Sequence, residues 1–209
     1  MHEPALGEQF VDLEHQSHAL RFGMWVFLIS EILLFAGLFT LYAAYRTMFM
    51  SDFKAGILHN TFAYGTANLF VLLTSGLTAA LAVHGARSGR RIFTGVMLST
   101  TAALGLTFLA IKLLEYRKHF EEGSLPGPWY RYHELPTFGG NRFFTMYWGL
   151  TGFHALHLTG GVVMMCWMAV HAFRGRYTPQ YHVKLEMGTL YWGLIDLMWI
   201  FLWPILYLS

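Results

Sequence analysis

Residues 187–208 of the chain read MGTLYWGLIDLMWIFLWPILYL and carry one charged side chain, that of Asp196. A helix needs about 20 apolar residues to cross the hydrocarbon core of a bilayer, so this stretch predicts a transmembrane helix. Asp196 falls near its middle. A carboxylate at that depth costs about 2.5 to 3.5 kcal/mol on insertion scales, so we expect Asp196 to face protein and to find a polar partner.

The composition of the whole chain agrees with an integral membrane protein. Of its 209 residues, 55% are hydrophobic and only 12% are charged, whereas soluble domains carry about 25% charged residues. The net charge of +2 and the scattered distribution of Lys and Arg argue against nucleic acid as a partner. The single cysteine, Cys166, cannot form an internal disulfide.

Four further apolar segments predict four more spans, at about residues 22–45, 61–85, 92–115 and 143–173. The expected fold is therefore an all-α bundle of five transmembrane helices over residues 21–209, preceded by a polar N-terminal arm at residues 1–20. Lys112 and Glu115 fall in the last turn of the third span, where their side chains are expected to reach the interface.

The connections between spans bear on loops and orientation. The segment 117–141 is rich in Gly, Pro and aromatic residues, so we expect an ordered external loop. Five spans place the two termini on opposite sides of the membrane. Lys and Arg are densest in the short connections at 87–91 and 174–184, which by a small margin favours a cytoplasmic N-terminus.

Ionisable residues inside the apolar segments are the first candidates for function. Counting 1.5 Å per helical residue from the flanking charges places Glu31, His154, His157 and Asp196 near the midplane. His154 and His157 are three residues apart and share one helix face.

Three interpretations of this group stay open. It is a structural hydrogen-bond cluster between helices, a site that handles protons or lipid headgroups, or a metal site. The spacing disfavours the metal, because di-iron bundles need a Glu-x-x-His motif from each of two helices and neither histidine has a Glu three residues before it. We therefore predict no metal ligands in this chain.

Five short motifs occur in order between residues 20 and 208. They are Arg21-Phe22-Gly23-Met24 with Ser30-Glu31; Asn68 with Leu72, Leu73, Ser75 and Gly76; Glu115-Tyr116; Thr151-Gly152-Phe153-His154-Ala155-Leu156-His157; and His182, Glu186, Tyr191-Trp192 and Asp196 to Trp199. In this order and spacing they resemble subunit III of the haem-copper cytochrome c oxidases, in its bacterial five-helix form. Two features depart from the family: Gly193 stands where a histidine is usual, and the segment 117–141 is longer than in the mitochondrial-type form.

The resemblance implies a subunit without a catalytic centre of its own, in an oxidase that couples oxygen reduction to proton translocation in aerobic respiration. Haem and copper are then expected in partner subunits, with oxidase subunit I as the main contact and subunit II, small subunits or a respiratory supercomplex as further partners. The implied role is to stabilise subunit I, to hold phospholipid between helices and to support proton uptake. A cytoplasmic N-terminus in the bacterial inner membrane is also implied.

The resemblance also nominates residues. Glu31 matches the carbodiimide-reactive membrane glutamate of the family. Candidates for lipid or interface contacts are Arg21, Asn68, Glu115, Tyr116, His182, Glu186 and Trp192, although the spacing of His182 and Glu186 alone fits a surface pair equally well. Alternatives are a quinol-oxidase subunit III, the accessory protein of nitric oxide reductase, or, in another class, a self-contained membrane enzyme or transporter that uses Glu31, His154 and Asp196.

Overall fold

The computed structural model describes residues 13–135, 137–179 and 181–208. Its long helices are α1 (Leu13–Met48), α3 (Phe62–Arg87), α4 (Arg91–Glu121), α5 (Phe138–Phe173) and α6 (Val183–Tyr207). All five are long and apolar enough to cross a membrane, which confirms the predicted five-span fold. A short helix, α2 (Met50–His59), joins α1 to α3, and one 3₁₀ turn, η1 (Gly127–Trp129), lies in the loop before α5.

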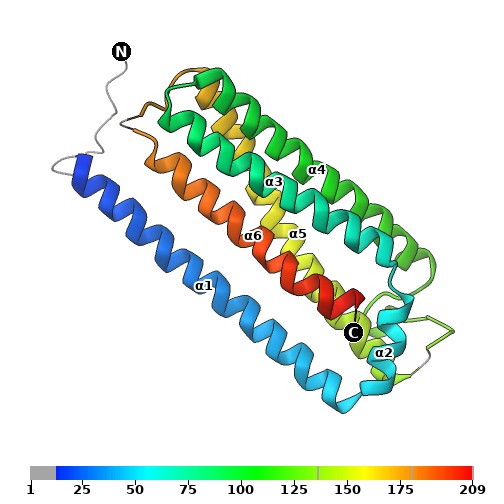
Figure 1. Ribbon diagram of the computed structural model, residues 1–209. Helices are drawn as coiled ribbons and strands as arrows, with labels where there is room; N and C mark the ends of the chain where they lie inside the picture. Colours follow the sequence, from blue (N-terminus) through cyan, green and yellow to red (C-terminus); the bar gives the residue numbers. More distant parts are fainter. Residues whose placement is uncertain (1–12, 136, 180, 209) are drawn as a thin grey trace.

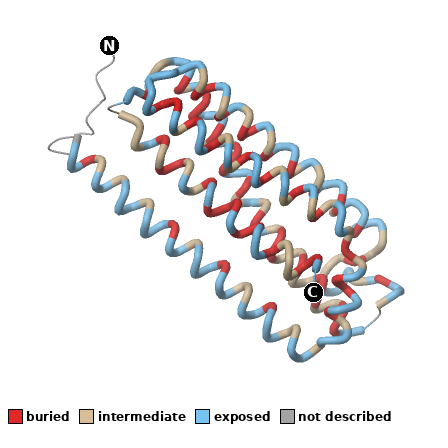
Figure 2. The backbone as a smooth tube through the Cα atoms, in the orientation of Figure 1, coloured by how far each residue is buried: buried red, intermediate tan, exposed pale blue. Residues whose placement is uncertain are grey.

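Helices α3 to α6 pack together as one bundle, and α1 lies beside it along α6 and α5 (Figure 1). The bundle interior is filled by large side chains that solvent does not reach, among them Trp192, Trp199, Tyr147 and Phe108. In its most apolar stretch α1 has 11% of its residues buried, against 33 to 39% in the other four spans. Figure 2 shows the same contrast as a mostly pale α1 beside a bundle with a red interior.

The outer face of α1 is apolar all the same. Phe22, Trp25 and Leu33 expose between 56% and 73% of their surface. In water such a face is unfavourable, whereas in a membrane it packs against lipid tails or another protein at no hydrophobic cost. The exposure pattern of α1 is therefore that of a helix that only a membrane or a neighbouring subunit covers.

Besides earlier starts of α5 and α6, at Phe138 and Val183, the helices differ from the predicted spans at three places. Residues 13–20 of the predicted N-terminal arm form the first turns of α1, and residues 1–12 lie outside the described part of the chain. The polar connection after the first span contains α2, because Phe53 and Ile57 give it one apolar face. Phe53 packs edge-on against Tyr42 and Phe143, with ring centroids 5.3 and 5.4 Å apart.

The third difference is the length of α4. The helix continues to Glu121 instead of ending at Glu115, so the external loop shortens to residues 122–137. Lys112 and Glu115 therefore lie about two turns inside the helix. The prediction that they reach the interface is wrong, because both side chains are enclosed by the bundle, at 2% and 0% exposure.

Candidate functional site

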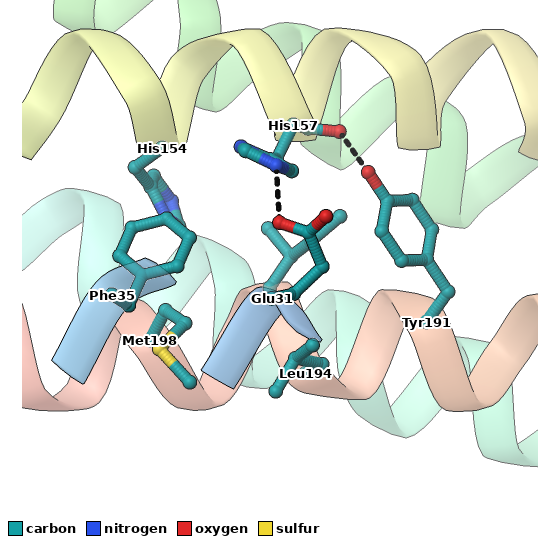
Figure 3. Close-up of a pocket in the computed structure, with 8 residues that line it drawn as sticks. Glu31, Phe35, His154, His157, Tyr191, Leu194 and Met198 are labelled. Carbon is teal, nitrogen blue, oxygen red and sulfur yellow. Dashed lines mark hydrogen bonds and ion pairs between the residues drawn. The ribbon is translucent and has the colours of Figure 1, made fainter. Parts of the chain in front are cut away.

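The clearest polar contact at mid-depth joins α1 to α5. Glu31 Oε2 lies 2.7 Å from Nε2 of His157 (Figure 3). The other ring nitrogen of His157, Nδ1, is 2.7 Å from the carbonyl oxygen of Phe153, which only accepts, so Nδ1 carries a proton. Glu31 Oε2 has no hydrogen-bond partner among the described residues, so the Glu31–His157 contact is a close approach of two ionisable groups at ion-pair distance.

A small pocket surrounds this pair. It is lined by Phe35 of α1, by His154 and His157 of α5, and by Tyr191, Leu194, Ile195 and Met198 of α6. Figure 3 shows Tyr191 on one side of the pair and Phe35, Met198 and His154 on the other. The Tyr191 hydroxyl donates to the backbone oxygen of His157 at 3.1 Å, so it fixes the backbone that carries the imidazole. The Glu31–His157 pair thus sits in a largely apolar seam between three helices.

His154 and Asp196 do not complete this site. His154 lines the pocket, but its ring lies between those of Phe108 and Trp199, with centroids 5.5 and 5.1 Å away. Asp196 lies against α3, where a Cβ added to Gly76 would come within 2.6 Å of its Oδ2. Its Oδ1 is buried without a hydrogen-bond partner among the described residues. Asp196 therefore faces protein as expected, but the polar partner that we expected is not found in the part of the chain that the structure describes.

A second polar site lies at the end of the bundle where α3 ends and α6 begins. The Glu186 carboxylate accepts from the guanidinium of Arg87 at 2.6 and 3.2 Å and lies 3.7 Å from that of Arg21. His182 Nε2 is 3.1 Å from the same carboxylate. The pair of His182 and Glu186 is thus part of a larger cluster that links α1, α3 and α6.

A groove of about 580 Å³ extends from this cluster between α1, α3 and α6, towards the middle of the bundle. Its wall on α3 consists of small residues, Gly76, Ala79 and Ala80, and its other walls include Trp25, Leu190 and Trp192. Gly193 also lines the groove, and a Cβ added there would meet nothing within 4 Å. The position of the missing family histidine therefore opens into free space in this groove.

A third polar site, around Lys112, was not predicted. Lys112 Nζ lies 3.0 Å from each of three oxygen atoms, those of Glu115 Oε2, Tyr147 and Tyr207. The Tyr207 hydroxyl also donates to Glu115 Oε1 at 2.7 Å. Four side chains from α4, α5 and α6 therefore form a closed hydrogen-bonded ion pair inside the bundle. The sequence did contain a signal for this site. Lys112 and Glu115 are three residues apart on one helix face, and six more helical residues follow them.

Three remaining predicted residues lie in the interior or at its edge. Asn68 has no exposed surface, and neither atom of its amide has a hydrogen-bond partner among the described residues. Tyr116 is half-buried and donates to Thr151 Oγ1 at 2.8 Å. Trp192 is buried and donates from Nε1 to Ser75 Oγ at 3.1 Å. Within this chain, Asn68 and Glu115 are too enclosed to contact lipid directly.

Comparisons with known proteins place the chain in context. A family model described as "Cytochrome c oxidase subunit III" matches residues 11–209. Similar proteins include cytochrome c oxidase subunit 3 of Synechocystis sp., 30% identical over 90% of this chain and 74% of the relative. The subunit of the same name from Petromyzon marinus is 28% identical over 90% of this chain and 69% of the relative. Quinol oxidase subunit 3 of Bacillus spizizenii is 29% identical over 97% of this chain and 94% of the relative.

Proposed function

This chain belongs to the cytochrome c oxidase subunit III family, and from that premise we propose that it protects the catalytic subunit of a haem-copper oxidase during turnover. It is a multi-pass membrane protein and a subunit of an oxidase complex. The proposal concerns what it does there: it supports proton uptake, holds phospholipid and stabilises subunit I, its main contact, with no catalytic centre of its own.

The observation that carries the proposal is the Glu31–His157 pair. A carboxyl group and an imidazole, which can exchange a proton, meet at mid-depth in a seam at the edge of the bundle, with side chains that are 15% and 17% exposed. Ionisable groups at such depth are costly and rare, and they mark proton relays in membrane proteins. α1 exposes the rest of its apolar face, which gives a neighbouring subunit a surface next to this pair.

The test is the Glu31→Ala variant in the purified oxidase. We expect normal assembly and a normal initial rate, followed by loss of activity within severalfold fewer turnovers, measured as oxygen consumption over time. The matched control is Ser30→Ala on the same helix, because the Ser30 hydroxyl bonds only to the backbone of its own helix. Decay of the Glu31 variant at the wild-type pace would leave the pair with a purely structural role.

The proposed phospholipid site is the groove beneath Glu186. Two arginines and a histidine surround this single carboxylate, so the cluster has positive charge left for a phosphate headgroup. The small side chains at 76, 79 and 80 leave room for an acyl chain. Arg21→Gln and Arg87→Gln are expected to lower the tightly bound phospholipid per complex, measured by mass spectrometry, whereas Arg90→Gln, exposed at the same end, is the matched control. Equal lipid in all variants would contradict this site.

Haem and copper are proposed to lie in neighbouring subunits, with subunit II and smaller chains as additional partners. The proposed location is the bacterial inner membrane with a cytoplasmic N-terminus. The Bacillus spizizenii relative, which matches along nearly its whole length, favours a quinol-oxidase assembly as a second candidate. The copurifying chains, the haem types in a visible spectrum and the electron donor distinguish these assemblies from a nitric oxide reductase accessory protein. Isolation without any haem-bearing partner would instead support a self-contained enzyme or transporter.

A further inference from the structure

Another cluster of ligand-type side chains lies at the end of the bundle opposite to Arg87 and Glu186. His59 is the last residue of α2, His119 lies in the last turn of α4, and Glu122 follows α4 directly. One ligand atom from each lies within 4.8 Å of the others. Within the described ranges, this is the only set of three or more His, Cys, Asp or Glu side chains gathered so closely.

The distances suit a small transition-metal ion. Glu122 Oε2 lies 2.8 Å from His59 Nε2 and 3.9 Å from His119 Nδ1. In a tetrahedral zinc site, bonds of about 2.0 to 2.2 Å separate neighbouring ligand atoms by roughly 3.3 Å. The two separations from Glu122 lie on either side of that value, and the two imidazole nitrogens are within 4.8 Å of each other, so movements of the side chains alone can bring all three atoms around one ion.

The hydrogen bonds of His59 orient both nitrogens of its ring. Tyr132 donates its proton to Glu134 Oε2 at 2.5 Å. The 2.7 Å contact between His59 Nδ1 and the Tyr132 oxygen is therefore donated by His59. Nε2 lies 2.8 Å from Glu122 Oε2, so the ring presents this nitrogen to the carboxylate.

The same contacts supply the outer shell that metal sites need. Metal-ligating histidines commonly donate their other N–H to an oxygen acceptor, as His59 does to Tyr132. His119 Nδ1 lies 3.1 Å from Ser124 Oγ, whose proton goes to the His119 carbonyl at 2.9 Å. Metal binding at Nδ1 therefore replaces the contact with Ser124.

Two lysines oppose a cation in this position. Lys118 Nζ lies 3.9 Å from the outer oxygen of Glu122, Oε1, and is also held by Thr61 Oγ1 at 3.1 Å. Lys112 is closer to the bundle centre and is paired with Glu115. Neither ammonium group contacts Oε2, the oxygen that faces both imidazoles.

We propose that His59, His119 and Glu122 bind one divalent transition-metal ion of the zinc class and so clamp the end of α2 to the end of α4. Two imidazoles and one carboxylate form a donor set that zinc uses in proteins, with water as the fourth ligand. The site is separate from the Glu31–His157 pair and from the groove beneath Glu186.

The test uses the intact oxidase complex, stripped with a chelator and dialysed against zinc, with zinc per complex measured by mass spectrometry. Glu122→Gln and His59→Gln are expected to bind one zinc ion fewer than the wild type. Glu121→Gln and His133→Gln are the matched controls, one exposed residue beside each ligand region, and both should bind zinc like the wild type. Zinc sites in other subunits cancel in these differences.

Equal zinc in the wild type and in both ligand variants would overturn the proposal and leave adventitious surface binding only. If either ligand variant loses this chain from the complex, Tyr132→Phe decides the question, because it keeps all three ligands and removes the acceptor for His59. A loss of zinc affinity of about 10- to 100-fold is expected for Tyr132→Phe. Unchanged affinity in that variant would exclude His59 as a ligand.

Discussion

The buried ion pair of Lys112 and Glu115 makes the sharpest prediction about stability. Its two charges are at most 2% exposed, and each is hydrogen-bonded to tyrosine hydroxyls as well as to the other. Glu115→Gln removes the negative charge and leaves the ammonium of Lys112 enclosed. Lys112→Met removes the positive charge and leaves the carboxylate with the Tyr207 hydroxyl as its donor.

The magnitude follows from the cost of an unpaired charge. Removing one partner of a buried pair destabilises by about 3 to 5 kcal/mol, because the remaining ion keeps its desolvation cost without the compensating attraction. Glu115→Gln belongs at the upper end of this range, since Lys112 Nζ loses an ionic partner and keeps only two neutral phenols. Lys112→Met belongs at the lower end, because the Tyr207 hydroxyl still donates to the remaining carboxylate.

The double variant Lys112→Met/Glu115→Gln is the decisive measurement. It leaves no buried charge, so its loss should be smaller than that of Glu115→Gln alone. The assay is SDS-induced unfolding of the detergent-solubilised complex. The unfolding midpoint is determined from the protease sensitivity of this chain at each SDS concentration. A matched control exists about one and a half turns later on α4, where Arg117 and Glu121 form a pair that is 77% and 62% exposed. Neutralising that pair should produce no measurable change.

Additive losses in the double variant would refute this reasoning. They would mean that Lys112 and Glu115 contribute independently, through packing or through the tyrosines, and not as a charge pair. Single variants as stable as the surface control would refute it as well, because they would show that water reaches the pair.

Two further predictions concern the packing of glycines and the carboxylate of Asp196. Gly193→Ala should leave the free energy of unfolding unchanged, because its Cβ enters free space. Gly56→Ala should lower the free energy of unfolding by about 1 to 3 kcal/mol, because its Cβ would overlap the ring of Phe143. Equal SDS midpoints for the two variants would contradict the packing seen around α2. Asp196→Asn should assemble normally, because no partner of Oδ1 in the described chain is lost; failure of this variant to copurify with the oxidase would mean that Asp196 bonds to a neighbouring subunit.

The number and order of the spans could be predicted from the sequence because hydropathy reports directly on transfer into lipid. Helix ends could not be predicted in the same way. Lys112 and Glu115 lower the local hydropathy, which suggests the end of a span, but a helix continues wherever neighbouring helices satisfy such charges. α2 was missed because four of its ten residues are polar, and Phe53 and Ile57 are its only large buried side chains.

The sequence predicted the depth of the candidate site residues in the membrane, but it did not predict which of them contact one another. Distance along a helix placed Glu31, His157 and Asp196 at similar depth, and a depth estimate carries no information on which helix faces which. Helix α6 contacts both α1 and α3, so its residues can face either neighbour. Asp196 faces α3, whereas Tyr191 and Leu194 on the same helix face the pair on α1 and α5. The orientation of α6 about its own axis therefore determines that Asp196 is separated from the Glu31–His157 pair.

The attachment of α1 connects these observations to the proposed role. In lipid the hydrophobic effect does not hold helices together, so a helix with a largely exposed apolar surface depends on polar contacts and packing. α1 has such contacts at three depths: Arg21 with Glu186, Glu31 with His157, and Tyr42 with the backbone oxygen of Ile205 at 3.0 Å. Successive contacts are about 15 Å apart along the helix. Loss of the middle one leaves α1 anchored at both ends but loose at the centre, next to the seam between α1, α5 and α6. This is why we expect Glu31→Ala to shorten the working life of the oxidase while its assembly is preserved.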